Sequence, residues 1–502
     1  HKSLAILPAT DPDCSARAWN PPAPTNGSAT AYYVDGAAGD NARAGTSPET
    51  AWRDFTPANG RTLGPGERLL LRRGSVFNQE LQISARGSAE AWAEIGAYGE
   101  GARPVIRRNR DIDDRCVLIK NPDYLRVRGL TVCYAGKGLI VYYAESGHRG
   151  LLIEDCIAHH IEGLYRFNAH GIPEWRDRSG APGDGGTSGG IAAGGSVGED
   201  IVFRDCEMFQ CSSGFRFTGR NVFIDRVFCH DNYAHNTSPH PFLTSVSRAY
   251  LMNSIFDASG WHAHAGTMGI MLGGQYGLII RNCHFLNQPD SGSHDEGGID
   301  FEAGGEGCLV DRCTFRNNAG AAIEMLGLKS PQTPNVEIAR SRFDRDNVAR
   351  KLGPSEIFIW GGSKDPAICC SSGLIRDNGY VLNPGVLFFT NQAPALTRWA
   401  LTNNTGYATA KALDKALPYD NPPAVDAGRE LWSDDARVRL AGKVSDDGKP
   451  VVSPRLLRRA LEYAKAFALP LIDHCEEPTL AETLRALPEM ALSEHVVNDY
   501  QT

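Results

Sequence analysis

The chain has 502 residues, of which 42% are hydrophobic and 22% are charged, and its formal net charge is −8. That length is enough to bury a core and to form more than one domain. The mild acidity, without a basic stripe, argues against nucleic-acid binding, and no apolar run of about 18 residues exists to indicate a membrane span.

Residues 1–30 are rich in Pro, Ala and Asn and are predicted to form an N-terminal arm. The region 31–405 is predicted to be one repetitive domain, because a short motif recurs from about residue 124 onward. An aliphatic or aromatic residue is followed by a small or sulfur-containing residue and then by an apolar one, as in Ile153/Cys156/Ala158, Phe203/Cys206/Met208, Ile280/Cys283/Phe285 and Val310/Cys313/Phe315. Spacings of roughly 20–30 residues are typical of a solenoid, in which each coil buries its apolar side against its neighbours.

Asn or Asp follows the aromatic member of several copies, as in Phe285-Leu-Asn287 and Phe315-Arg-Asn317. Such residues tolerate the backbone conformations that tight corners require. We therefore expect these positions to be the corners at which each coil turns.

The chain has 13 cysteines. The repeat places four of them at one equivalent inward position, namely Cys156, Cys206, Cys283 and Cys313. Stacked coils would arrange these residues in a ladder, where a free cysteine acts as a small buried apolar residue. Reduced, structural cysteines are therefore predicted, and a metal site is less favoured because no Cys-x-x-Cys pair occurs.

Four segments precede the repeat in a characteristic order: Tyr32–Gly36, Gly45–Trp52, Leu63–Gly74 and Ile95–Ile106. Together with the repeat, they resemble the N-terminal end of secreted, right-handed parallel β-helix proteins of the pectate-lyase-like superfamily. The resemblance covers about residues 30–405 and implies an all-β solenoid, a secreted or cell-surface/periplasmic location, and a polysaccharide or oligosaccharide partner. It does not specify a reaction, because lyases, hydrolases and noncatalytic adhesins share this fold.

A further strand is predicted after each corner. Its second and fourth residues point inward, as Ile299 and Phe301 do, and the residue between them faces solvent. Aligned in this way, the outward column reads Ala192, Arg216, Met271, Asp300, Glu324, Phe358. Stacked strands lie about 4.8 Å apart, so two carboxylates are predicted to be neighbours.

Asp300 and Glu324 are the leading candidates for catalysis, and Glu302 lies on the same face as Asp300. Hydrolysis of a glycosidic bond needs one carboxylic acid to protonate the leaving oxygen and one carboxylate as base or nucleophile. Like charges close together raise one pKa, which keeps one group protonated. We expect Asp300 and Glu324 to be the acid/base pair, with Glu302 as the substitute for either. A solvated acidic patch is the alternative interpretation.

The loop 288–297 precedes the acidic strand and carries His294, Asp295 and Glu296. These residues are predicted to contact substrate, with a role as general acid also open. A Ca²⁺ site built from hard oxygen ligands is another interpretation of the same residues, and a plain polar turn is a third. No cofactor is otherwise indicated.

Two further groups of residues are candidates for sugar contact. Trp261, His262 and His264 lie one coil before the acidic strand, and the two histidines alternate on one strand face. No third ligand has a fixed spacing to this pair, so sugar contact is favoured over metal binding. Trp360 lies beyond Phe358 and is expected to position sugar as well.

Arg216 supports the main competing function. An arginine on the outward column can hold a uronic acid carboxylate, as a polysaccharide lyase requires for β-elimination. The insertion 163–189, rich in aromatic residues and arginine, is expected to wall the same site. Acids dominate the predicted face and lysines are sparse there, so hydrolysis is favoured over elimination. A noncatalytic glycan-binding or adhesin-like protein is the third hypothesis.

Residues 406–502 change in character and are predicted to form a linker and a small mixed α/β segment with a capped helix from Ser453. The stretch Leu469–Pro478, with Ser445–Gly448 before it, resembles the middle of a dihydroorotase. In that family the histidine of the His-Cys-Glu motif, here His474, is a metal ligand. The family's early His-x-His pair and carboxylated lysine have no counterpart in this chain. One ligand cannot make a catalytic metal site, so no dihydroorotase chemistry is expected.

Overall fold

The computed structural model describes residues 29–111, 113–161, 163, 165–167, 173–175, 189–232, 235–239, 247–259, 268–272, 275–290, 294–302, 305–326, 332–360, 370–394 and 397–418. The chain divides into two compact units, residues 1–425 and 426–502, and all described residues belong to the first. The predicted N-terminal arm up to residue 28 and the dihydroorotase-like segment lie outside the described residues.

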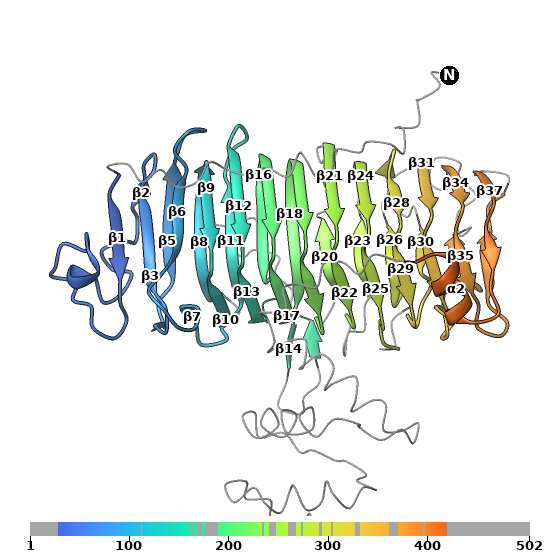
Figure 1. Cartoon of the computed structure of the whole chain (residues 1–502), viewed down its shortest axis with the longest axis horizontal. Helices are drawn as coiled ribbons and strands as arrows, with labels where there is room; N and C mark the ends of the chain where they lie inside the picture. The colour runs from blue at the N-terminus through green and yellow to red at the C-terminus, as the bar shows by residue number, and fades with distance from the viewer. Residues whose placement is uncertain are drawn as a thin grey trace, which may run out of the picture. The chain divides into compact units, whose positions relative to one another are not determined.

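The described residues form a parallel β-helix with three faces (Figure 1). In most coils the chain contributes a strand to the first face, then to the second, then to the third, before it enters the next coil. Successive strands of each face pair in parallel. This is the all-β solenoid that the repeat predicted.

The first face consists of β2 (Thr62–Leu63), β5 (Leu81–Arg86), β8 (Arg115–Asp123), β11 (Lys137–Tyr143), the first parts of β16 (Ile191–Arg204) and β18 (Ser213–Asp225), β20 (His235–Pro239), β23 (Met268–Leu272), β26 (Gly297–Phe301), β30 (Ile323–Met325), β33 (Ser355–Ile359) and β36 (Leu387–Asn391). The second face consists of β1 (Ala31–Val34), β3 (Arg68–Arg72), β6 (Ala93–Tyr98), β9 (Leu125–Arg128), β12 (Arg149–Glu154), the later parts of β16 and β18, β21 (Ser247–Met252), β24 (Gln275–Arg281), β27 (Gly305–Glu306), β28 (Leu309–Asp311), β31 (Gln332–Ala339), β34 (Cys370–Arg376) and β37 (Arg398–Thr402).

The third face consists of β4 (Val76–Phe77), β7 (Val105–Arg107), β10 (Thr131–Ala135), β13 (Ile157–Ile161), β17 (Glu207–Cys211), β19 (Phe228–His230), β22 (Ile255–Asp257), β25 (His284–Leu286), β29 (Thr314–Arg316), β32 (Arg342–Asp344), β35 (Gly379–Val381) and β38 (Thr405–Gly406). Three further elements complete the described part: an antiparallel hairpin of β14 (Tyr165–Phe167) and β15 (Pro173–Trp175), a short helical turn at Pro48–Thr50, and helix α2 (Ala410–Ala416).

The corners follow the expectation from the Asn and Asp pattern. Asn287 and Asn317 both adopt the left-handed backbone conformation, with φ of 54° and 57°. The side-chain amide of Asn317 donates a hydrogen bond of 2.9 Å to that of Asn287 in the coil before it. The corners are therefore joined from coil to coil by side chains as well as by strand pairing.

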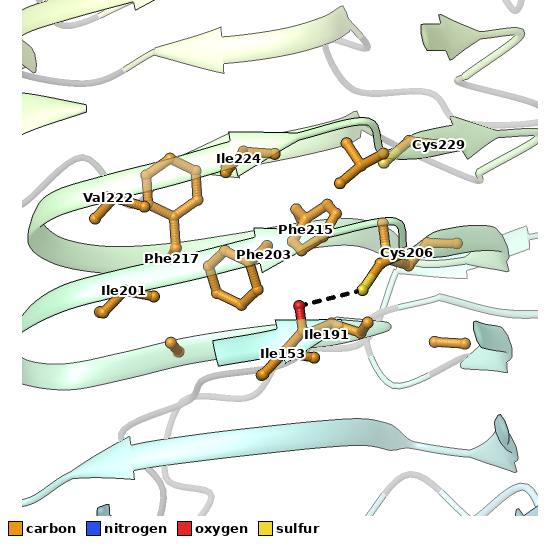
Figure 2. Close-up of a cluster of buried hydrophobic side chains, with 14 of the residues drawn as sticks. Ile153, Ile191, Ile201, Phe203, Cys206, Phe215, Phe217, Val222, Ile224 and Cys229 are labelled. Carbon is orange, nitrogen blue, oxygen red and sulfur yellow. Dashed lines mark hydrogen bonds between the residues drawn. The ribbon is translucent and has the colours of Figure 1, made fainter. Parts of the chain in front are cut away.

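The interior is built from columns of equivalent side chains. Phe256, Phe285, Phe315 and Phe343 stack with ring centroids 5.0–5.3 Å apart. Cys156, Cys206, Cys283 and Cys313 are buried and reduced, as predicted. The thiol of Cys206 donates to the carbonyl of Ile153 at 3.6 Å, which Figure 2 shows among the apolar side chains around it. The sulfur column therefore also links one coil to the previous one.

One corner near the C-terminal end of the stack buries two acids. Asp346 accepts hydrogen bonds from the backbone and side-chain amides of Asn318 at 2.9 and 2.7 Å. Glu356 lies near the backbone amide and the carboxyl of Asp346, but neither of its oxygens makes a hydrogen bond of ordinary geometry. Burial raises the pKa of Asp346 to about 7, although the bonds from Asn318 act in the opposite direction. Burial and the charge of Asp346 raise the pKa of Glu356 as well. A proton held between the two carboxyls is the simplest way to satisfy Glu356.

The substitution Asp346→Asn tests this pair. A carboxyl whose pKa is raised by folding stabilises the protein fully only below its unfolded value, and this contribution is lost as the pH rises through the folded value. For Asp346 this contribution is lost between pH 3.8, the ordinary pKa, and pH 7, roughly the pKa in the folded protein. We expect the variant to lose less stability than the wild type across this window, and to be more stable at pH 8 by about 1–3 kcal/mol. Denaturant unfolding at several pH values measures the difference.

Asparagine suits this position because Asn318 occupies the equivalent place one coil earlier. The exposed Asp113 offers a matched control, since Asp113→Asn should leave the pH dependence of stability as it is in the wild type. Identical pH profiles for the wild type and Asp346→Asn would contradict the proposed proton sharing.

Candidate active site

The first face carries the predicted column of outward residues, with one error. Asp300 of β26 pairs with Glu324 of β30, Met271 precedes Asp300, and Phe358 follows Glu324. Arg216 and Met271 were expected to be neighbours, which is wrong: β20 lies between their strands. Arg216 is therefore three strands from Asp300, about 14 Å at the usual strand spacing.

The two central acids do not face solvent, contrary to the prediction. Asp300 is 2% exposed and Glu324 is 0% exposed. Their neighbour Phe358 is buried too, because the preceding corner packs on it, and a Cβ on Gly353 would lie 2.3 Å from its ring. Alternation along a strand identifies the side on which a residue lies, but not what covers that side. Here the outward side of the sheet is buried at Asp300, Glu324 and Phe358.

Burial disfavours the charged forms of these acids. Burial raises the pKa of Asp300 well above its ordinary value, and the charges of Glu302, Glu324 and Asp295 raise it further. The pKa of Glu324 is raised by burial first and then by Asp295 and Glu302. Glu324 lies near the backbone amide of Ala321, but neither of its oxygens makes a hydrogen bond of ordinary geometry. The charged forms of both groups are therefore unfavourable.

Asp295 and Glu302 complete this group, which we call the acid cluster: Asp295, Asp300, Glu302 and Glu324. Both added residues are partly exposed. Burial, followed by the charge of Glu302, raises the pKa of Asp295 to about 6, while His294 acts in the opposite direction. Asp300 shares a hydrogen bond with Glu302. The cluster thus has two buried acids with raised pKa values and two carboxyls that are partly exposed.

Three glycines allow the backbone approaches on which the cluster depends. A Cβ on Gly297 would lie 2.0 Å from the carbonyl oxygen of Ala321, and one on Gly320 would lie 1.6 Å from that of Asp295. A Cβ on Gly298 would overlap the next coil in the same way. Only glycine permits such contacts, so the Gly297-Gly298 pair and Gly320 let the corner carrying Asp295 lie against the next coil.

The other predicted contact residues have mixed outcomes. His294 is exposed beside Asp295, whereas Glu296 is fully buried. Trp360 is partly exposed and follows β33, two coils beyond Glu302, and its backbone amide donates to Met325. The predicted trio of Trp261, His262 and His264 lies outside the described residues. Their roles, and that of Arg216, remain predictions.

Sequence reasoning missed Lys351, whose ammonium group lies 3.0 and 3.1 Å from the two carboxyl oxygens of Glu296. The sequence signal that could have identified it is a lysine in the corner two coils after the acidic loop. For the Ca²⁺ interpretation of the loop, the described residues offer no group of three or more His, Cys, Asp or Glu side chains that could hold a metal ion. In the same part of the chain, no helix is long and apolar enough to cross a membrane.

Comparison with known proteins supports the fold class. Residues 184–343 match the family model described as a right handed beta helix region. The structure superposes on that of a GH136 lacto-N-biosidase from Eubacterium ramulus with a TM-score of 0.56 and 16% identity, covering 76% of this chain and 68% of that one. The chain is therefore an all-β, right-handed parallel β-helix protein.

Two kinds of curated relative match by sequence. A lacto-N-biosidase from Bifidobacterium longum is 45% identical over 93 residues, which is 17% of this chain and 6% of that protein. A dihydroorotase from Syntrophobacter fumaroxidans is 62% identical over 39 residues, 8% of this chain and 9% of that protein. The chain thus spans less than a tenth of the length of each of these two relatives.

The substitution Gly320→Ala tests how the corners support the cluster. The added methyl group would meet the Asp295 carbonyl, so the corner must shift, and we expect a loss of about 1–3 kcal/mol in stability. Gly64→Ala is the matched control, because its Cβ would lie 3.5 Å from the flexible Glu67 carboxylate. Thermal unfolding compares the two. Equal melting temperatures would show that the contact at Gly320 is not limiting.

Proposed function

We propose that the protein is a carbohydrate-active enzyme that hydrolyses a glycosidic bond at the acid cluster. The observation that carries this proposal is the pair of partly exposed carboxyls, in which Asp295 has its pKa raised to about 6 beside Glu302. A carboxyl with a raised pKa next to a second carboxylate is the arrangement that acid-assisted glycoside cleavage needs.

The roles of the four acids follow from their exposure. Asp295 is the general acid that protonates the leaving oxygen, and Glu302 is the carboxylate that acts on the anomeric carbon, directly or through water. Asp300, neutral and buried, donates its proton in a hydrogen bond to Glu302 and so orients it. Glu324 adds a second neutral acid behind the pair. This assignment replaces the sequence-based one, in which Asp300 and Glu324 were the acid/base pair.

The proteins that resemble this chain support hydrolysis. Both the partial sequence relative from Bifidobacterium longum and the structural neighbour from Eubacterium ramulus are named as lacto-N-biosidases. We infer an oligosaccharide or polysaccharide substrate, with Trp360 as a sugar-stacking platform on the same edge of the face as Glu302. A secreted, cell-surface or periplasmic location is part of this proposal, because glycans are met there.

A polysaccharide lyase is the second candidate, and Arg216 is the observation in its favour. Elimination requires a cation that neutralises the substrate carboxylate beside the base. The charges that act most strongly on Asp300 and Glu324 come from other carboxylates, and Arg216 lies three strands away. A uronic acid would be repelled at the cluster. A noncatalytic adhesin gains nothing from a buried group of like charges, which costs stability.

The variants Asp295→Asn and Glu302→Gln separate the two proposed roles. On an oligosaccharide ending in a lacto-N-biose unit, each should lower kcat/KM by at least about 100-fold. On p-nitrophenyl lacto-N-bioside, whose leaving group needs little protonation, Asp295→Asn should retain much more activity than Glu302→Gln. Chromatographic product analysis and release of p-nitrophenol provide the rates. Products with an unsaturated, ultraviolet-absorbing end would instead identify a lyase, and full activity in both variants would refute the assignment.

The pH dependence of the wild type gives a separate test. Asp295 must be protonated to act as the acid, so kcat/KM on the oligosaccharide should fall as the pH rises through about 6. The aryl glycoside should show a weaker decline over the same range. An activity that keeps rising above pH 7 on both substrates would contradict the role of Asp295.

A further inference from the structure

Lys351 lies in the corner between β32 and β33 and contacts the corner that carries Asp295. Its ammonium group donates to both carboxyl oxygens of Glu296, at 3.0 and 3.1 Å, and also to Asp290. These two acids stand at either end of the segment 290–296. One lysine therefore ties both ends of the segment that presents Asp295.

The lysine reaches across an intervening coil, and backbone hydrogen bonds join the three corners along this span. The amide of Asn347 donates to the carbonyl of Gly320 at 2.9 Å, and the amide of Gly320 donates to that of Glu296 at 2.8 Å. The middle corner consists of small residues at Ala319, Gly320 and Ala321, so no side chain blocks the path. Three successive corners are thus bonded in series, with Lys351 spanning the outer two.

Glu296 needs a fixed cation for two reasons. It is fully buried, and a buried carboxylate is costly unless it is paired. Its φ of 55° is also unusual for a residue with a side chain, so the surrounding contacts must hold its backbone. Burial alone would lower the pKa of Lys351, but its bonds to Asp290 and Glu296 raise it, so the lysine stays charged.

The charge of Glu296 reaches the acid cluster. It acts on Asp295 and on Glu324, in each case in the direction that raises the pKa. The other ionisable groups that act on Asp295 are Glu302, at the end of β26, and its neighbour His294. Lys351 donates hydrogen bonds to both carboxyl oxygens of Glu296, so its positive charge acts against this contribution.

We propose that Lys351 is a positioning residue of the active site, which holds the corner of Asp295 through Glu296 and compensates the Glu296 charge. The proposal rests on the proposed hydrolytic function and deepens it. Lys351 does not touch the substrate. It sets the direction from which Asp295 approaches the leaving oxygen and the pH range over which Asp295 keeps its proton.

The test compares Lys351→Met, Lys351→Arg and the double variant Lys351→Met/Glu296→Gln on the lacto-N-biose oligosaccharide. Lys351→Met should lower kcat by about 10- to 100-fold, with KM within about twofold of wild type, since the acid is displaced but the sugar contacts remain. Its alkaline pH limit should rise by about one unit, because the positive charge of Lys351 no longer acts against the charge of Glu296. Lys351→Arg should restore both properties, and the exposed Lys411→Met is the control for losing a lysine.

The double variant distinguishes the two effects of Lys351, which are to compensate the charge of Glu296 and to hold the corner that carries Asp295. It buries no unpaired charge, so it should fold even where Lys351→Met does not. Its alkaline limit should return to that of the wild type, while kcat stays low because the tie is absent. A wild-type kcat in the double variant, or an unmoved alkaline limit in folded Lys351→Met, would overturn the proposal.

A readout without substrate keeps this inference separate from the proposed function. Carbon-13 NMR titration of the aspartate carboxyls, with Asp295 assigned by its loss in Asp295→Asn, reports the protonation of Asp295 directly. Lys351→Met should move this titration to higher pH. If the wild type cleaves no glycan but the titration moves, the hydrolytic function fails and the link from Lys351 to Asp295 stands. If the wild type cleaves and the titration does not move, only the role of Lys351 fails.

Discussion

The parallel pairing of one coil with the next is the constraint on which the rest of this structure depends. Pairing in register places every residue directly beside its equivalent in the neighbouring coil, at about 4.8 Å. Apolar side chains at equivalent positions pack against one another, as the Phe256–Phe343 stack and the cysteine column show. Ionisable equivalents are forced together by the same geometry. Asp300 and Glu324 are neighbours because the register makes them so, and their mutual repulsion cannot be relieved by sliding one strand.

This constraint explains why so much of the fold could be predicted. A motif that recurs once per coil identifies the corners, the inward columns and the outward column with little ambiguity, and Asn287 and Asn317 turn the chain where expected. The prediction failed at β20. That strand reads His-Asn-Thr-Ser-Pro, without the apolar alternation used to align the others, and so it was left out of the outward column. Its backbone pairs with β18 and β23, and such pairing leaves no mark in the sequence.

The candidate site could be predicted only in part, for a different physical reason. Alternation assigned Asp300 to the correct side of its strand, but it could not show that the side chain there is buried. Those corners differ in length from coil to coil, so a repeat carries no information about them. The same limitation hid Lys351, which meets Glu296 across a coil of small residues. Contacts within a column follow from the register, whereas contacts between corners depend on loop geometry.

The two groups of buried acids show how a structural use of carboxyls differs from a catalytic one. Asp346 and Glu356 are closed off, and a proton shared between them is sufficient to satisfy the corner that they occupy. In the acid cluster, Asp300 and Glu324 are just as buried, but their neighbours Asp295 and Glu302 reach the surface. Repulsion between carboxyls that are all buried, as in the first group, only lowers the stability of the fold. In the acid cluster, repulsion raises the pKa of a partly exposed carboxyl, Asp295, so that a substrate can reach its proton. This difference favours the acid cluster as the reactive site.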